Sequence, residues 1–161
     1  MLNSKLEFQE IKMYPAEEEH VEYILNILNP YMNAGKLLPR NKNDILKHLR
    51  SFFIASYRNN YVGCVAVRDY ENGLFEIRSL AVSADVSGKG VGSALITFAI
   101  EVVKNECEGQ KVFALTRRPN VFTRLGFKIV PMEMFPKKIW FDCSKCKKLD
   151  NCDEVAVLYT L

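Results

Sequence analysis

Apolar and polar residues alternate along several short stretches of the chain, and a period of about two residues is typical of β-strands. Pro15 is expected to end the first of these strands, because proline cannot donate a hydrogen bond to a neighbouring strand. The short polar connections 58–60 and 70–73 predict hairpins between strands that follow one another closely. The predicted strands are residues 6–13, 51–57, 61–69, 74–82, 111–116, 126–130 and 153–161.

Apolar residues recur three and four positions apart in longer segments, which predicts helices between the strands. The first helix is expected over 17–32, with acidic residues in its first turn where they suit the helix dipole. Pro30 is expected to end or kink it. A second helix is expected from a cap at Asn43 or Asp44 to about Arg50. The other predicted helices are an amphipathic one over 88–105 and a short one over 119–125.

The order of these elements, β-α-α-β-β-β-α-β-α-β-β, predicts an α/β or α+β fold in which helices flank one mixed sheet. A length of 161 residues fits one domain, residues 1–161, and no repeat or linker divides it. Forty-eight per cent of the residues are apolar and 25 per cent are charged, which is enough apolar material for a core in a globular protein.

Net charge and the N-terminal sequence narrow the classes of partner. A charge of +3 without a concentrated basic stripe argues against nucleic acid as a partner. The N-terminal residues hold no apolar run of signal-peptide length, and no segment approaches the length of a membrane span. We therefore expect a cytoplasmic protein that does not contact a membrane.

The segment 80–93 passes from a predicted strand through a glycine-containing loop into a predicted helix. Glycines at a helix N-terminus let a ligand approach the backbone, and the exposed N–H groups with the helix dipole suit a pyrophosphate. Lys89 adds a mobile positive charge. A tight turn without a ligand is the alternative. A P-loop is excluded because no Gly-Lys-Ser/Thr sequence ends the loop, and the preceding strand is not the first of a Rossmann unit.

This segment resembles the acetyl-CoA signature of the GNAT family of acetyltransferases, Gln/Arg-x-x-Gly-x-Gly/Ala after a strand ending in Leu-Ala-Val. Ser87 stands in the Gln/Arg position, and the resemblance continues through 113–116 and 122–127. It implies the GNAT fold, with a central mixed, mostly antiparallel sheet, and acetyl-CoA as cosubstrate. The positions it implies for acetyl-CoA binding are Leu80, Ala81, Val82, Ser87, Gly88, Lys89, Gly90, Val91, Gly92, Ser93, Phe122 and Arg124.

The segments 37–40, 76–82 and 113–116 resemble more specifically the acetyltransferase domain of bacterial N-acetylglutamate synthases, in their short stand-alone form. This implies direct transfer of an acetyl group from acetyl-CoA to the α-amino group of an amino acid in a ternary complex. L-glutamate is the first candidate, in arginine biosynthesis. Another amine (glutamine, another amino acid or a peptide N-terminus) and a non-catalytic acyl-CoA-binding regulatory module are the alternatives.

The resemblance also implies roles for single residues. Glu76 occupies a position where many GNAT enzymes carry an acid that acts as base, directly or through a water. On a regular strand Glu76 and Arg78 share a face about 6–7 Å apart, so a structural ion pair is the alternative, and a bulge would change this parity. Arg40, before the second helix, and then Arg78 are the candidate anchors for a substrate carboxylate. A solvated loop charge is the alternative for Arg40.

Phe122 stands where many family members carry a tyrosine that acts as general acid. The usual residue therefore cannot protonate the leaving group in this chain. A thiol with a pKa of roughly 8–9 is a tolerable leaving group. We expect the thiolate to leave unassisted or to take a proton from water.

The five cysteines fall into two groups. Cys64 and Cys107 lie in apolar-patterned segments and are expected to be small buried side chains. The other three, with C-x2-C-x5-C spacing in the loop 142–153, are candidate metal ligands: Cys143, Cys146 and Cys152. Structural zinc takes four ligands, so the fourth would be an aspartate, a distant side chain or a residue of a second subunit in a homodimer. A metal site, a redox-sensitive pair and reduced packed thiols remain three alternatives.

Overall fold

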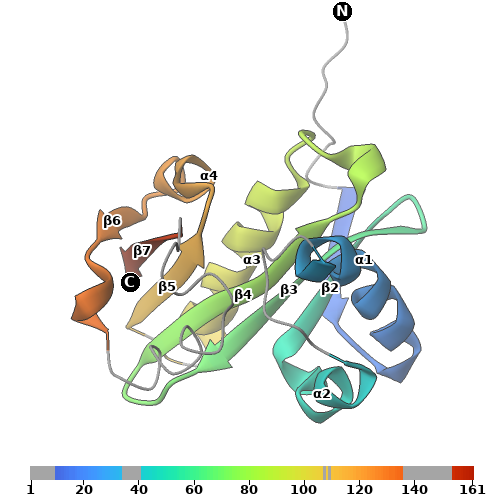
Figure 1. Cartoon of the computed structure of the whole chain (residues 1–161), viewed down its shortest axis with the longest axis horizontal. Coiled ribbons are helices and arrows are strands. Elements are labelled where there is room, and N and C mark those ends of the chain that lie inside the picture. Colours follow the sequence, from blue (N-terminus) through green and yellow to red (C-terminus); the bar gives the residue numbers. More distant parts are fainter. Residues whose placement is uncertain (1–9, 34–40, 107, 109, 136–153) are drawn as a thin grey trace, which may run out of the picture.

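A seven-stranded mixed sheet forms the centre of the molecule (Figure 1), as seen in a computed structural model that describes residues 10–33, 41–106, 108, 110–135 and 154–161. The order across the sheet is β1-β2-β3-β4-β5-β7-β6, and every neighbouring pair is antiparallel except β4 and β5. This confirms the predicted mixed, mostly antiparallel sheet. The strands are β1 (Ile11–Pro15), β2 (Phe52–Tyr57), β3 (Asn60–Asp69), β4 (Leu74–Val82), β5 (Lys111–Thr116), β6 (Lys128–Val130) and β7 (Val155–Thr160).

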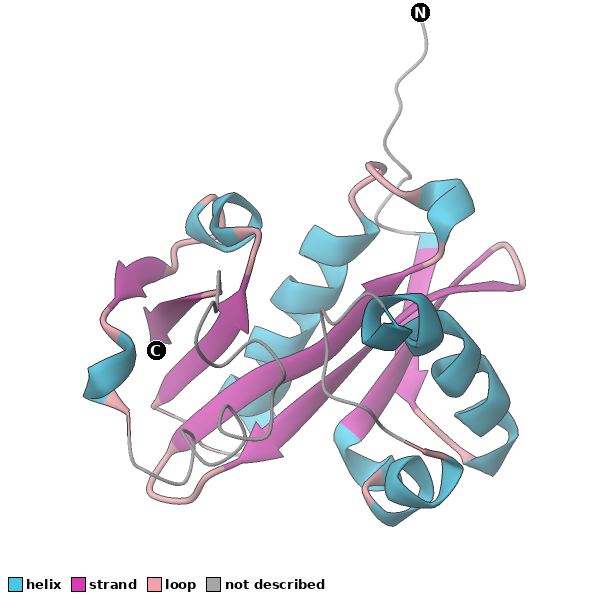
Figure 2. Cartoon of the chain, in the orientation of Figure 1, coloured by secondary structure: helices cyan, strands magenta, loops and turns pink. Residues whose placement is uncertain are grey.

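Helices cover both faces of this sheet (Figure 2), so its central strands are buried on both sides. In β2, Phe53 and Ala55 pack into the cluster formed with α3, whereas Phe52 and Ile54 pack into the cluster formed with α1 and α2. This division follows from the alternating direction of side chains along a strand. The helices are α1 (Val21–Asn33), α2 (Lys42–Lys47), α3 (Val91–Glu106) and α4 (Pro119–Thr123).

The first helix stays close to its predicted range of 17–32, but it does not end at Pro30. A 3-10 turn, Glu18–His20, leads into α1, and the helix continues through Pro30 to Asn33. Pro30 lies in the last turn, where it removes only one backbone hydrogen bond of the helix. Tyr31 and Met32 still pack against the α1 core cluster, and this packing favours continuing the helix.

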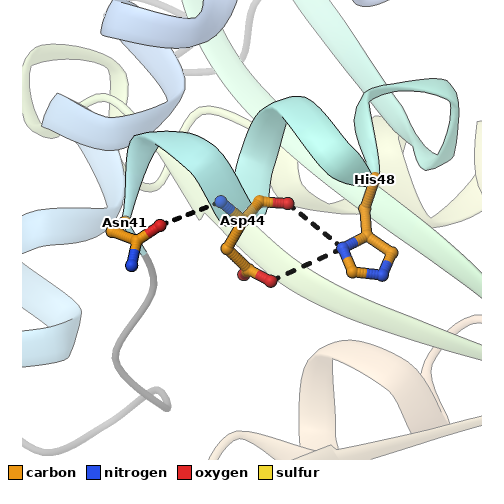
Figure 3. A network of polar contacts seen from close by, with 3 residues as sticks. All are labelled: Asn41, Asp44 and His48. Carbon is orange, nitrogen blue, oxygen red and sulfur yellow. Dashed lines mark hydrogen bonds and ion pairs between the residues drawn. The ribbon is translucent and has the colours of Figure 1, made fainter.

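The second helix begins at Lys42, and its cap lies two residues before the first cap that the sequence suggested. The side chain of Asn41 caps it, because its Oδ1 accepts a hydrogen bond from the Asp44 N–H at 2.9 Å (Figure 3). The carboxylate of Asp44 instead lies 3.5 Å from His48 Nδ1. The prediction of Asn43 or Asp44 as cap was therefore wrong. The helix ends at Lys47, and a 3-10 turn over Leu49–Ser51 replaces its expected last turn.

The ends of β1, α3 and β6 also differ from the predictions. β1 continues to Pro15, and residues 6–9 of the predicted first strand lie outside the described residues. α3 begins at Val91, because the preceding glycines stay in the loop. β6 begins at Lys128. Within the described part of the chain, no helix has the length and apolar character required to cross a membrane.

A β-bulge and a divergence of strands interrupt the centre of the sheet. Cys64 pairs with Ala81 and Ala66 with Arg78, so two residues of β4 lie opposite the single residue Val65. One of the two, Ser79, has a φ of 52°, in the left-handed region. β4 and β5 pair only over residues 74–76 and 111–113, and the two strands then diverge (Figure 1). The sheet therefore splits beside the second half of β4.

Candidate active site

The loop between β4 and α3 takes the geometry expected of an anion site. Gly88 and Gly90 have φ values of 78° and 91°, which favour glycine, and a Cβ at either position would meet no atom within 4 Å. At the start of the helix the Ala94 N–H donates to the Gly90 carbonyl, at 3.0 Å. The N–H groups of the first turn thus have no carbonyl partner within the helix, and they lie at the positive end of its dipole.

The end of β4 lies directly against the start of this helix. A Cβ at Gly92 would lie 3.8 Å from Val82 Cγ2, which is ordinary van der Waals contact. Ala81 and Val91 are buried, whereas Ser87 and Gly88 are exposed. The structure therefore brings the predicted strand and loop together on one side of the sheet. Between them, Leu80, Val82, Lys89, Gly90, Gly92 and Ser93 are half-buried.

The two remaining candidates for cofactor binding lie at α4. Phe122 is buried and packs edge-on against Phe127, with ring centroids 5.1 Å apart. It belongs to the same core cluster as α3. Arg124, directly after α4, is exposed. The Phe122 ring therefore contributes to the core, and Arg124 is the more accessible of the two side chains.

Glu76 is a buried carboxylate at the point where β4 and β5 begin to diverge. It is 7% exposed, and its Oε1 accepts a hydrogen bond of 2.9 Å from the Tyr70 hydroxyl. Arg78 Nη1 lies 3.5 Å from the same oxygen. The bulge at Ser79 follows both residues, so Glu76 and Arg78 keep the shared face expected of a regular strand. The ion pair foreseen as the alternative for Glu76 is present, although it is long.

Tyr70 is a site residue that the sequence did not indicate. It begins the turn before β4, and its N–H donates to the Leu74 carbonyl at 2.9 Å. Burial raises the pKa of the Tyr70 hydroxyl, and the neighbouring Glu76 carboxylate raises it further. Glu71, Asn72 and Gly73 all have positive φ values in this turn. The tight reversal brings Tyr70 beside Glu76, and spacing within the strand gives no sign of this contact.

A second contact missed by the sequence joins α1 to the end of β4. The Tyr23 hydroxyl and Ser83 Oγ are 2.9 Å apart, and the Ser83 N–H donates to the Val62 carbonyl at 2.8 Å. Burial is the largest cause that raises the pKa of Tyr23 to about 12. Ser83 leads into the 3-10 turn Ala84–Val86 and then into the glycine loop. The contact therefore ties a helix on one face of the sheet to the loop before α3.

Four predicted site residues lie outside the described residues: Arg40, Cys143, Cys146 and Cys152. Cys107, which was expected to be buried, also lies outside them. Cys64 is fully buried, as predicted, and its thiol donates to the Ser79 carbonyl with an S–O distance of 3.4 Å. No group of three or more His, Cys, Asp or Glu side chains that could hold a metal occurs among the described residues. The zinc hypothesis thus depends wholly on the loop 142–153.

Known proteins of two kinds are similar to this chain. Relatives by sequence include an uncharacterized N-acetyltransferase of Chlorobaculum tepidum, 41% identical over 138 residues that cover 86% of this chain and 88% of the relative. An amino-acid acetyltransferase of Mycobacterium tuberculosis is 32% identical over 116 residues, covering 70% of this chain and 65% of the relative. The chain thus spans about two thirds of the length of the mycobacterial protein.

Among solved structures, N-acetylglutamate synthase from Neisseria gonorrhoeae, complexed with coenzyme A and N-acetyl-glutamate, superposes with a TM-score of 0.84. The identity is 22%, and the match covers 94% of this chain but only 35% of that chain, so it shows the fold alone. A Mycobacterium tuberculosis protein in complex with CoA gives a TM-score of 0.77 at 26% identity, covering 93% of this chain and 99% of that chain.

The model of the acetyltransferase (GNAT) family matches residues 14–127, which is more than half of the chain. The match includes β4, the glycine loop and α3 and ends at Phe127, after α4. The chain therefore belongs to the GNAT family of acetyltransferases, which confirms the fold, the enzyme class and the acetyl-CoA cosubstrate predicted from its sequence.

Proposed function

We propose that this enzyme acetylates the α-amino group of an amino acid, with L-glutamate as the first candidate and arginine biosynthesis as its setting. The observation that carries the proposal is the position of Glu76. This carboxylate is buried where β4 and β5 diverge, and the same strand runs on to the glycine loop at α3. Similarity to an amino-acid acetyltransferase of Mycobacterium tuberculosis supports an amino-acid acceptor.

The glycine loop is the proposed site for the pyrophosphate of acetyl-CoA. The open space at the Cβ positions of Gly88 and Gly90 lets phosphate oxygens approach the backbone N–H groups of the first turn of α3. Lys89 supplies a positive charge beside them. The pantetheine arm would then follow Leu80–Val82, where β4 no longer pairs with β5. Arg124, exposed beyond α4, is proposed as a further contact.

Acetyl transfer needs a neutral amine beside a polarised thioester carbonyl. In the proposed reaction Glu76 accepts a proton from the acceptor ammonium, directly or through a water. The amine nitrogen then attacks the carbonyl carbon, and a backbone N–H at the end of β4 stabilises the charge that develops on the oxygen. When the carbon–sulfur bond breaks, the thiolate leaves with its electron pair, and the second proton that the nitrogen loses on forming the amide passes through water to the thiolate. Phe122 is buried and carries no proton for this step.

An acidic acceptor also needs a cationic anchor. Arg78 lies beside Glu76 and keeps 21% of its side chain exposed. A bound amino acid could place a carboxylate on this guanidinium while its amino group faces Glu76. Bidentate geometry makes arginine the best side chain for a carboxylate. Arg40, which precedes the Asn41 cap of α2, is proposed as the second anchor.

A thiol-release assay with acetyl-CoA and a panel of amines tests this proposal. We expect turnover with glutamate and much less with glutamine, aspartate, other amino acids and a peptide N-terminus. Turnover only with one of those amines would refute glutamate as the acceptor but keep the chemistry. Calorimetric titration with acetyl-CoA completes the test. Tight binding without turnover on any amine would favour a non-catalytic acyl-CoA-binding module.

A further inference from the structure

Two side chains approach the same oxygen of the Glu76 carboxylate, the neutral hydroxyl of Tyr70 and the charged guanidinium of Arg78. The Tyr70 hydroxyl lies 2.9 Å from Oε1, within the ordinary range of hydrogen bonds, whereas Arg78 Nη1 lies 3.5 Å away, at its limit. We infer that Tyr70 is the positioning residue that holds Glu76, so that Arg78 can leave the carboxylate to bind an acidic acceptor. This inference rests on the proposed function.

The Tyr70 ring is fixed by its neighbours. Its centroid lies 5.6 Å from that of Phe113, which stacks in turn on Phe135 at 4.5 Å. The guanidinium of Arg68 lies over the Tyr70 ring, 4.7 Å from its centroid. Tyr70 itself is only 4% exposed. The hydroxyl is therefore presented by a packed aromatic ring, and its direction does not depend on Arg78.

Arg78 differs from Tyr70 in both exposure and reach. Its side chain is 21% exposed, compared with 10% for that of Glu76, and its guanidinium stands at the end of a long aliphatic stem. Moving such a guanidinium by a short distance toward an incoming carboxylate requires no change in the core. The Tyr70 hydrogen bond would keep Glu76 in place during this exchange, and loss of the arginine's positive charge from the carboxylate would strengthen Glu76 as a base.

The charges around Glu76 set the expected pH dependence. Arg78 lies on the same strand, and Arg68 lies directly opposite Glu76 on β3. On the other side, Phe113 of β5 pairs with Glu76 and brings no charge. A hydroxyl that donates to a carboxylate stabilises its ionised form. Removing the hydroxyl while both arginines remain should therefore raise the pKa of Glu76.

The test compares Tyr70→Phe with Arg78→Gln, and Tyr57→Phe on β2 serves as a matched control for loss of a tyrosine hydroxyl. The pKa of Glu76 is measured by carbon-13 NMR of glutamate-labelled protein, with its signal assigned by its absence in Glu76→Gln. In Tyr70→Phe we expect the pKa of Glu76 to rise by about one unit. The acetylation rate at pH values below that pKa should then fall about tenfold. The KM values for acceptor and acetyl-CoA should stay within about twofold of wild type. Arg78→Gln should instead raise the KM for glutamate at least about tenfold, and loss of its positive charge should also raise the pKa of Glu76.

Two results would overturn the inference. One is a Glu76 titration in Tyr70→Phe that matches that of wild type and of Tyr57→Phe. The other is a KM for glutamate in Arg78→Gln that stays within about twofold of wild type. If Tyr70→Phe does not fold, the reciprocal measurement in wild type and Glu76→Gln replaces it. The pKa of Tyr70, followed by carbon-13 NMR of labelled tyrosine, must then fall in Glu76→Gln, and an unchanged value refutes the contact.

The proposed function can fail separately from this inference. If Glu76→Gln keeps the wild-type rate at every pH, Glu76 is not the base. The NMR titrations would still report whether Tyr70 or Arg78 controls the carboxylate. If Glu76→Gln loses activity but Tyr70→Phe changes neither rate nor titration, only the role of Tyr70 is refuted.

Discussion

Replacing Gly90 and Gly92 by alanine separates two reasons for having glycine at the start of α3. Gly90 has a φ of 91°, whereas Gly92 lies in the first turn of the helix and its added Cβ would make ordinary contact with Val82, at 3.8 Å. Neither methyl group would clash. The two variants therefore differ in backbone strain and in what the methyl group faces, while the chemical change is identical.

The expected energies follow from these conformations. A non-glycine residue in left-handed backbone costs roughly 1–2 kcal/mol. Against this, alanine restricts the unfolded chain and returns about 0.4–1 kcal/mol. Gly90→Ala should therefore lower the free energy of unfolding by about 1 kcal/mol, and Gly92→Ala should raise it by about 0.5 kcal/mol. The difference of about 1.5 kcal/mol corresponds to roughly 3–6 °C in Tm for a chain of this size.

Urea unfolding followed by circular dichroism measures these changes in the free energy of unfolding. Steady-state kinetics measures how each variant changes the KM for acetyl-CoA. The Gly90 methyl group would occupy the space through which a phosphate must approach the N–H groups of α3. Loss of one charge-assisted hydrogen bond, about 1.5–3 kcal/mol, predicts a rise in the KM for acetyl-CoA of about tenfold or more. Equal changes in stability for the two variants would refute the argument from backbone strain. A wild-type KM in Gly90→Ala would refute the approach of a phosphate at this loop.

Three further variants address the rest of the site. Glu76→Gln should lower the rate most at low pH, where the acceptor amine most needs a base, and should leave acetyl-CoA binding by calorimetry intact; an unchanged pH–rate profile contradicts the assignment. The pKa of Tyr23 is raised from 10 to about 12, so the folded protein keeps this proton longer than the unfolded chain does. The stability that this proton contributes should therefore be fully present below pH 10 and be lost between pH 10 and 12. Tyr23→Phe should lose less stability than wild type over that range. This variant should also raise the KM for acetyl-CoA with little change in kcat, and equal alkaline unfolding of both proteins would refute the raised pKa that burial gives Tyr23. Asn41→Ala should cost about 1 kcal/mol of unfolding free energy and Asn41→Ser much less, because serine also caps a helix; equal losses would refute the cap.

Local patterns were sufficient to predict most of the strands and the glycine loop. The alternating direction of side chains along a strand describes β2 well, because Phe53 and Ala55 face one helical layer while Phe52 and Ile54 face the other. The loop before α3 was predictable because its glycines require left-handed backbone that other residues rarely adopt. Each of these features is determined by residues close together in the chain.

Features that depend on distant or competing contacts were not predictable. Pro30 taken alone indicated an end or a kink in α1, and the continuation of the helix to Asn33 depends on the packing of Tyr31 and Met32, which outweighs one lost hydrogen bond. The contact between Tyr70 and Glu76 depends on the shape of a turn with three positive φ values. The choice of Asn41 over Asn43 as a cap depends on where the helix begins, and several polar residues in succession leave this open.

The position of β7 between β5 and β6 has a consequence for how the protein folds. β7 pairs antiparallel with both neighbours. Neither β5 nor β6 can therefore form its backbone hydrogen bonds to β7 until residues 155–160 are present. The pairing of β5 with β7 joins segments 39 to 49 residues apart in sequence, much as the pairing of β1 with β2 does, but its second strand is synthesised last. β1 to β4, which are joined by hairpins or packed through α1, can form while synthesis continues. The sheet is therefore expected to assemble from the β1 side, and the split beside β4 separates the half that forms early from the half that forms last.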